Sequence, residues 1–128
     1  MRRSLSALFA PALALTLAAV LTGACGGGGG KAPAPAADAR RIDVSAKSFQ
    51  FDPSTITAKP GEDLAIALTS KDAVHDFVVE HTDFKIEAGK GKTTVGGLRL
   101  DKPGTYTFYC SIPGHRSAGM HGTIVVAP

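Results

Sequence analysis

The sequence contains no tryptophan, and it has only two cysteines and two methionines among its 128 residues. Aromatic residues make up 6% of the chain, so a hydrophobic core must depend on aliphatic side chains and a few phenylalanines. Two cysteines allow one disulfide. A bond between Cys25 and Cys110 would join a glycine run to the body of the chain, however, and would constrain little. Cys110 is therefore a thiol for which another role is expected.

A marked excess of charge of one sign is also missing. The chain has 14 basic and 11 acidic residues, and Arg2 and Arg3 belong to the N-terminal leader described below. Without them the chain has 12 basic and 11 acidic residues, so its net charge is about +1 with histidine neutral. A nucleic-acid-binding domain normally presents a basic face. The charge balance therefore argues against a nucleic-acid partner.

The apolar run near the N-terminus is too short to span a membrane comfortably. It extends over 15 residues, from Ala7 to Leu21, and contains Pro11, whereas a spanning helix needs about 20 apolar residues. Arg2 and Arg3 precede the run and the small residues of "TGAC" follow it. This order is typical of an export signal. We therefore predict that residues 1–24 are a signal peptide and that the mature protein is exported.

The junction "LTGAC" resembles the lipobox of bacterial lipoproteins, although Thr22 stands where that pattern prefers an aliphatic residue. The resemblance implies that a lipid on Cys25 holds the protein at the outer face of the cytoplasmic membrane or in the periplasm. Ordinary signal cleavage with Cys25 unmodified is the alternative. Residues 25–40 combine five glycines with "KAPAPAADA", a composition that cannot bury enough apolar surface to fold. We predict a flexible tether there.

Residues 41–128 show no internal repeat and no amphipathic helix pattern, but short alternating runs recur between turns rich in Pro, Gly and Asp. These runs are "RIDVSAKSFQF", "STITAKP", "DLAIALTS", "HDFVVE", "KTTVGGLRL", "TYTFYC" and "GTIVVAP". Parallel strands would need crossover helices, for which no signal is present. The prediction is an all-β domain, a Greek-key antiparallel β-sandwich of about seven to eight strands.

Alternation within the predicted strands assigns their inward faces. In "GTYTFYC" it places Tyr106, Phe108 and Cys110 on one face. Cys110 thus ends an inward-facing row. The predicted core contains Ile42, Val44, Phe49, Phe51, Ile56, Leu64, Ile66, Leu68, Phe77, Val79, Ile86, Val95, Leu98, Tyr106, Phe108, Ile124 and Val126.

Four potential metal ligands lie in two distant segments. Cys110, His115 and Met120 are evenly spaced in a segment whose Pro and Gly residues predict a loop, and His75 stands at the start of an earlier predicted strand. Adjacent strands of a sandwich can bring all four to one end. Two imidazoles and a thiolate with a weak axial thioether are the ligands of a blue copper centre, whereas zinc usually takes further Cys or His.

The segments "GTYTFYCSIPGHRSAGMHGTIVV", "FQFDPSTITAKPGEDLAIALTS" and "VHDFVVE" resemble plastocyanin-like cupredoxins over nearly all of residues 41–128. The loop spacing is most similar to that of rusticyanin and auracyanin. The resemblance implies that one copper ion, cycling between Cu(I) and Cu(II), binds to four ligands: His75, Cys110, His115 and Met120. It also implies that His115 reaches the surface within an apolar patch where redox partners dock transiently. The patch is formed by Ile112, Pro113, Gly114, Ala118 and Gly119.

One position departs from that family. The residue after the first histidine ligand is commonly Asn or Ser, which ties the two ligand segments together by a hydrogen bond, but this chain has Asp76. An ionised carboxylate accepts hydrogen bonds and cannot donate them. Asp76 is thus a predicted neighbour of the ligands whose effect on the reduction potential stays open.

Three functions are compatible with copper. The first is an exported, membrane-tethered and monomeric carrier of single electrons, and the alternative is a copper delivery or storage protein. The chain has no His-rich or Met-rich tract for passing copper on, which favours the carrier. An enzyme would need a second copper centre. Only His81 and His121 are left to build one, and both are predicted to be exposed, so we expect no enzyme.

Overall fold

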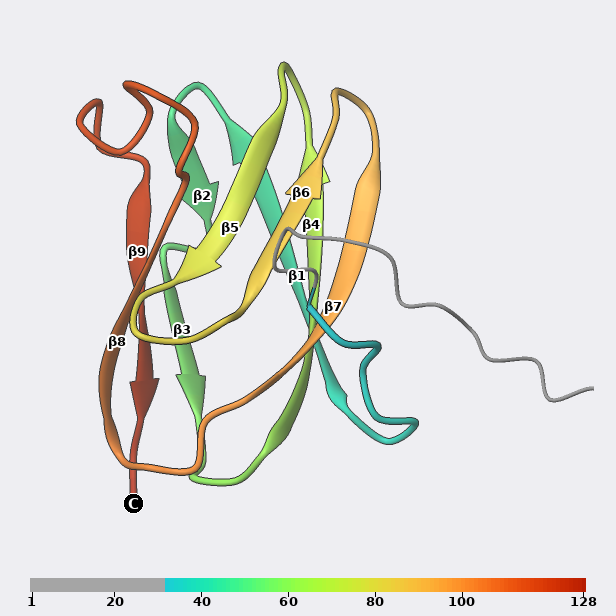
Figure 1. Cartoon of the computed structure of the whole chain (residues 1–128), viewed down its shortest axis with the longest axis vertical. Coiled ribbons are helices and arrows are strands. Elements are labelled where there is room, and N and C mark those ends of the chain that lie inside the picture. The colour runs from blue at the N-terminus through green and yellow to red at the C-terminus, as the bar shows by residue number, and fades with distance from the viewer. Residues whose placement is uncertain (1–31) are drawn as a thin grey trace, which may run out of the picture.

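The computed structural model describes residues 32–128, so the predicted signal peptide and Cys25 lie outside the described residues. Nine strands form the described part of the chain (Figure 1). They are β1 (Arg40–Lys47), β2 (Gln50–Asp52), β3 (Thr55–Ala58), β4 (Asp63–Ser70), β5 (His75–Val79), β6 (Lys85–Ala88), β7 (Thr93–Arg99), β8 (Gly104–Tyr109) and β9 (His121–Val126). Among residues 32–128 there is no helix of the length and apolarity that a membrane crossing requires.

The strands form two sheets, which confirms the predicted all-β sandwich. One sheet has the order β2-β1-β4-β7 and the other has the order β3-β9-β8-β5-β6. The prediction of purely antiparallel sheets was wrong, because β1 pairs with β4 and β3 pairs with β9 in parallel. No helix is needed between β1 and β4. The chain leaves the first sheet after β2, runs through β3 in the second sheet, and returns as β4.

The core between the sheets is largely the predicted one, and the rings of Phe51, Phe77 and Phe108 pack together in it. The rings of Phe77 and Phe108 are stacked with centroids 4.3 Å apart. Two core predictions were wrong, since Phe49 and Val95 are exposed. Phe49 lies in a turn. Val95 and Leu98 are three residues apart in β7, so one strand cannot point both inward.

Residues 32–35, the described end of the predicted tether, pack against β6 and β7. The backbone N–H of Ala32 donates to the Lys85 carbonyl at 3.1 Å, and that of Gly97 donates to the Pro33 carbonyl at 2.7 Å. A side chain at position 97 would collide with the Ala34 carbonyl, 2.8 Å from its first carbon. This part of the segment therefore belongs to the packed domain.

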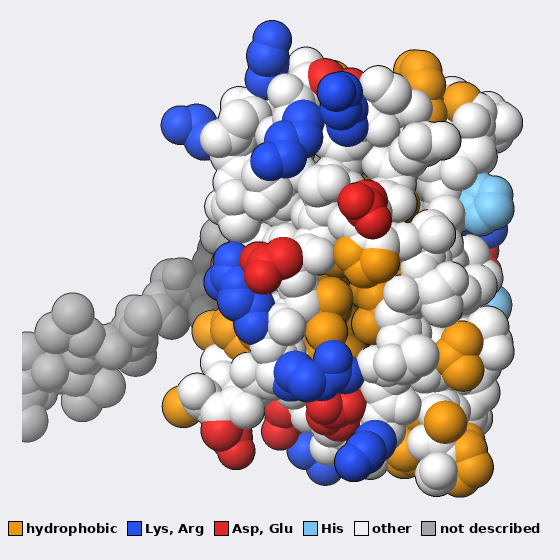
Figure 2. Space-filling view, turned by 180° about the vertical axis from the view of Figure 1, so that it is seen from behind, with side chains coloured by type: hydrophobic (Ala, Val, Ile, Leu, Met, Phe, Trp, Pro, Cys, Tyr) orange, Lys and Arg blue, Asp and Glu red, His pale blue; other side chains and the backbone are white. Residues whose placement is uncertain are grey.

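The loops of the sandwich gather at its two ends. The β1–β2 turn, the β4–β5 loop and the β8–β9 loop lie together at the upper end in Figure 1. We call this the loop end. The β3–β4 and β7–β8 connections lie at the opposite end, which we call the distal end. Seen from behind, basic and acidic side chains are interspersed near the lower end of the molecule (Figure 2).

Candidate metal centre

Three of the four predicted ligands meet at the loop end. His75 is the first residue of β5, Cys110 directly follows β8, and His115 lies in the β8–β9 loop. The Nδ1 atoms of the two histidines are 3.2 Å apart. The Cys110 Sγ atom lies 3.5 Å from Nδ1 of His115 and 4.0 Å from Nδ1 of His75. His75 and Cys110 are buried and His115 is partly exposed.

Met120, the fourth predicted ligand, is fully buried beside this group. It directly precedes β9. Its backbone N–H donates to the His115 carbonyl at 3.1 Å, and its carbonyl accepts from the Cys110 N–H at 3.0 Å. The β8–β9 loop therefore folds back on itself and returns Met120 to the neighbourhood of Cys110.

The donor atoms fit a single soft metal ion. Ligands that each stand about 2.0–2.3 Å from one ion are separated from one another by roughly 3.3–4 Å, close to the spacing of these three atoms. Burial raises the pKa of the Cys110 thiol above its ordinary value, so the metal-free protein keeps the proton there. A bound cation favours the thiolate. Thiolate, thioether and two imidazoles are the donors that select copper.

Asp72, in the β4–β5 loop, orients the first histidine. Its Oδ1 atom lies 2.7 Å from Nε2 of His75. Because a carboxylate accepts, Nε2 carries the proton and Nδ1 is left free for the metal. The backbone N–H of Ser48 also donates to Asp72, and together with the His75 contact this bond holds the pKa of Asp72 below its ordinary value.

Asp76 ties the two ligand segments together as an acceptor. The side chain is completely buried and accepts hydrogen bonds from the backbone N–H of Ser111, at 2.5 Å, and from the Ser111 hydroxyl. Lys85 forms an ion pair with it at 3.1 Å. Burial raises the pKa of Asp76, but the bonds from Ser111 and Lys85 outweigh it, and the pKa lies below its ordinary value. The β5–β8 ladder ends at Val78 and Tyr109. If the same register continued, Ser111 would lie opposite Asp76. The Asp76 side chain therefore accepts the Ser111 N–H where the next bond between the two backbones would otherwise form.

The residues predicted to form the docking patch lie around His115. Pro113, Gly114, Ala118 and Gly119 are exposed, and Ile112 packs partly against the core. A mainly apolar hollow beside Cys110 is lined by Tyr109, Cys110, Ser111, Ile112, Pro113, Gly114, Arg116 and Ser117. The Arg116 guanidinium lies 4.1 Å above the ring of Tyr109 and pairs with Glu80, which fixes this side of the loop.

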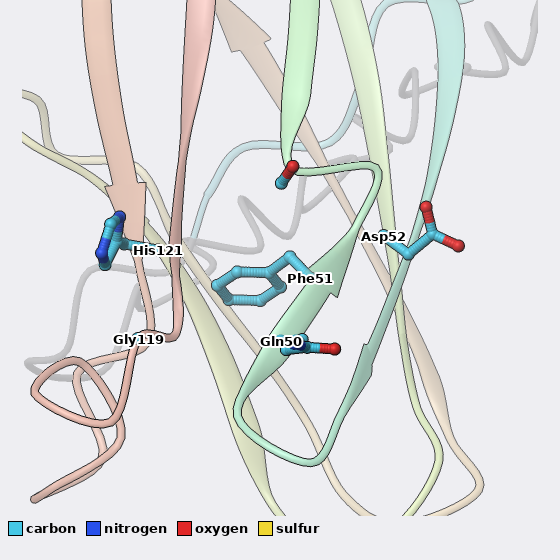
Figure 3. Close-up of a pocket in the computed structure, with 6 residues that line it drawn as sticks. Gln50, Phe51, Asp52, Gly119 and His121 are labelled. Atoms are coloured by element: carbon cyan, nitrogen blue, oxygen red, sulfur yellow. The ribbon is translucent and has the colours of Figure 1, made fainter.

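His81 and His121 lie away from the donor group, as the sequence predicted. Both are exposed. His121 borders a hollow between β2 and β9 that is also lined by Gln50, Phe51, Asp52, Ser54 and Gly119 (Figure 3). Residues 32–128 contain one group of three His, Cys or acidic residues spaced for a metal ion, and it consists of His75, Cys110 and His115.

Sequence reasoning missed three residues around the site, of which two contact a ligand directly. Phe49 was assigned to the core, but its ring meets the His115 ring edge-on, with centroids 4.9 Å apart. Asp72 and Lys85 were not identified from the sequence, and the contact of Lys85 with Asp76 crosses between two strands. The position of Asp72 three residues before a histidine ligand could have suggested a carboxylate partner.

The family model described as the cupredoxin-like domain matches residues 12–126. Cytochrome c oxidase subunit 2 of Thermus thermophilus is 33% identical over 89 residues, which cover 66% of this chain and 64% of that subunit. The match covers 51% of the same subunit from another strain of that organism, so the chain spans between half and two thirds of these relatives. The copper-resistant cuproprotein CopI of Rubrivivax gelatinosus is 30% identical over 119 residues, covering 73% of this chain and 71% of CopI.

A solved structure shows the same fold. Reduced auracyanin from Roseiflexus castenholzii superimposes with a TM-score of 0.63 and 20% identity, covering 70% of this chain and 98% of auracyanin. The family match, the fold and the donor set agree with one another. The chain belongs to the cupredoxin-like family, and its type 1 site, formed by His75, Cys110, His115 and Met120, takes one copper ion.

Proposed function

We propose that the protein is an exported carrier of single electrons, in which the copper ion alternates between Cu(I) and Cu(II). A copper ion held by His75, Cys110, His115 and Met120 would supply one-electron chemistry, with the electron accepted from a reduced partner and passed to an oxidised one. The observation that carries the proposal is the convergence of two imidazole nitrogens and one thiol sulfur, within 4.8 Å of one another, at a largely buried site. This donor set suits both oxidation states.

The surroundings of the ligands favour a carrier because they restrict rearrangement. Backbone bonds join His115 to Met120 and Met120 to Cys110, and the buried Asp76 side chain holds Ser111. A ligand set held on several sides changes little between the two oxidation states. His115 is the partly exposed ligand, and the apolar residues around it support transient docking of a redox partner there.

The proposed site of action is outside the cytoplasm. The leader of residues 1–24 and the "LTGAC" junction support export and a lipid on Cys25 that attaches the monomer to the outer face of the cytoplasmic membrane or holds it in the periplasm. Mass spectrometry of the mature N-terminus tests this part. A mass that shows unmodified Cys25, or cleavage beyond it, contradicts lipid attachment.

The absorption spectrum and voltammetry of the copper-loaded protein test electron transfer. We expect an intense thiolate-to-copper charge-transfer band and a reversible one-electron wave. Cys110→Ala should abolish the band, whereas His121→Ala, a matched control at an exposed histidine of the adjoining strand, should preserve it. A colourless copper protein, or a band that survives Cys110→Ala, contradicts the proposal.

Copper delivery or storage is the second candidate function, and the likeness to the copper-resistant cuproprotein CopI favours it. The two functions differ in how firmly the ion is held. A carrier retains copper through repeated oxidation and reduction, whereas a delivery protein gives it up readily to an acceptor. Incubation with the Cu(I) chelator bicinchoninate during redox cycling separates them, because rapid transfer of copper would favour delivery.

A further inference from the structure

The turn between β1 and β2 has an unusual composition for its backbone conformation. Lys47 pairs with Gln50, so the turn consists of Ser48 and Phe49 alone. Both residues have positive φ angles, 52° and 61°. Two-residue turns of this kind strongly prefer Asn or Gly, and a bulky aromatic residue with positive φ is a rare and unfavourable choice. Such an outlier points to a role for the side chain it carries.

The ring of Phe49 is directed at a copper ligand. It meets the His115 ring at 83°, with centroids 4.9 Å apart. Edge-to-face contacts of this geometry are favourable. Phe49 is 46% exposed, so the ring does not serve the core but forms an outer cover on the partly exposed imidazole.

One carboxylate holds both this turn and the other histidine ligand. The Oδ2 atom of Asp72 accepts the backbone N–H of Ser48 at 2.8 Å, and its Oδ1 atom lies 2.7 Å from Nε2 of His75. The loop that carries Asp72 is itself fixed, because the Lys71 N–H donates to the Ala46 carbonyl at 3.0 Å. Asp72 thus connects His75 to the segment that covers His115.

We propose that Asp72 is a positioning residue for both histidine ligands: it orients His75 directly and, through Ser48, keeps Phe49 over His115. The inference rests on the copper site of the proposed function. Its consequence is kinetic as well as geometric. With both imidazoles held, a histidine must break further contacts before it can leave the metal, so copper exchange is slow. Loss of Asp72 releases both histidines, whereas loss of the Phe49 ring uncovers only one.

The test compares the copper-loaded full chain with Asp72→Ala, Asp72→Asn, Phe49→Ala, Phe49→Tyr and the double variant Asp72→Ala/Phe49→Ala. The control is Asp43→Ala, which removes an exposed carboxylate of the same net charge from β1. The first measurement is the rate of Cu(I) transfer to bicinchoninate. The second is the hydrogen-exchange rate of the His75 Nε2–H, measured by NMR in the Cu(I) protein.

We expect Asp72→Ala to speed copper transfer about tenfold or more, because losing the hydrogen-bond partner of a ligating histidine typically lowers metal affinity by about 10–100-fold. The His75 Nε2–H should then exchange fast. Phe49→Ala should speed transfer less, and Phe49→Tyr, which keeps the ring edge, should match the wild type. The increase in transfer rate in the double variant should be smaller than the product of the two single increases, because Asp72→Ala already loosens the Phe49 ring over His115.

Asp72→Asn is included because a fast copper transfer in Asp72→Ala could result from misfolding alone. Its side chain has the same shape but only one acceptor oxygen for two donors, so it should lose one of the two bonds while staying folded and blue. The inference is overturned if Asp72→Asn and Asp72→Ala both behave like Asp43→Ala, or if the effects of Asp72 and Phe49 multiply independently. A wild-type protein that fails to bind copper or show the blue band would instead overturn the proposed function.

Discussion

The two ends of the sandwich use charged residues in different ways. At the loop end the carboxylate of Asp76 is completely buried. Its bonds from Ser111 join the segments that hold His75 and Cys110, and its ion pair with Lys85 joins β5 to β6. At the distal end Arg40 pairs with Glu62 and Arg99 pairs with Asp63, and these side chains remain in contact with water. The same residue types therefore occupy two very different environments.

The difference indicates which charges define structure and which mainly keep the surface solvated. A buried charge must be paired and hydrogen-bonded, because its loss leaves the partners without water to replace it. An exposed ion pair contributes typically about 0–1 kcal/mol, since water solvates either partner alone. The loop end should therefore be sensitive to single substitutions that the distal end tolerates.

Asp76→Ala should cause the largest loss of stability. It leaves the Ser111 N–H and hydroxyl without their acceptor and separates Lys85 from its counter-ion. Breaking a buried pair costs about 3–5 kcal/mol, and the partial exposure of Lys85 places this case near the lower limit, about 3 kcal/mol. Urea unfolding of the metal-free protein measures the change. The matched variant Asp63→Ala at the distal end should cost less than about 1 kcal/mol. Equal losses at the two positions would refute the contrast.

Gly122→Ala tests how tightly the loop end is packed. A side chain on this residue of β9 would begin 2.3 Å from the Phe108 ring and 2.3 Å from the Ser54 carbonyl oxygen. Since the backbone atom cannot move aside cheaply, we expect a loss of about 2–3 kcal/mol in thermal or urea unfolding.

The distal comparison for that variant is Gly61→Ala. There the added side-chain carbon would lie 3.3 Å from the Arg99 guanidinium, which is flexible and can move aside. The destabilisation then comes from placing alanine at a positive φ of 74°. That cost is about 1 kcal/mol. If Gly61→Ala is the more harmful of the two, packing at the loop end is looser than the structure indicates.

The sequence predicted the local part of the site well. Cys110, His115 and Met120 lie in one short segment, so their order and the Pro and Gly residues between them were sufficient to predict a loop that carries three ligands. His75 followed because its position at a strand start is visible in the pattern of turns and alternation. Asp72 and Phe49 were not found, because each contacts a ligand from a separate turn, and such contacts appear only once three loops meet at one end.

The parallel strand pairs were missed for a related reason. Alternation shows that β1 and β4 are strands, but it does not show which neighbour each one takes. The chain passes between β1 and β4 through the opposite sheet, so the pairing depends on how two layers face each other. Local sequence patterns therefore do not indicate that β1 pairs with β4.

Lys85→Gln should have a moderate effect on stability and a clear effect on the copper ion. The Lys85 ammonium lies 3.1 Å from the completely buried Asp76 carboxylate, which keeps its two bonds from Ser111 when the ammonium is removed. The expected loss is therefore smaller than for Asp76→Ala, about 1–2 kcal/mol. Removing a positive charge near copper favours the more positive Cu(II), so the reduction potential should fall. Voltammetry measures this shift, with Lys90→Gln on the exposed β6–β7 turn as the control. An unchanged reduction potential would show that the charge of Lys85 does not affect the copper ion.

Glu62→Gln at the distal end should have the smallest effect, and one that depends on pH. Hydrogen bonds from the Arg40 side chain and the Lys59 N–H lower the pKa of Glu62 from 4.5 to about 2. A carboxyl group with a depressed pKa stabilises the fold above the unfolded-state value, and this contribution is lost as the pH falls from 4.5 to about 2. Because the pair is exposed to solvent, we expect about 0.5–1 kcal/mol at pH 7 and almost none at pH 2. Urea unfolding of Glu62→Gln and wild type at both pH values measures the difference, and about 1 M salt should reduce it at pH 7. A larger loss at pH 2 than at pH 7 would show that Glu62 acts through packing rather than through its charge.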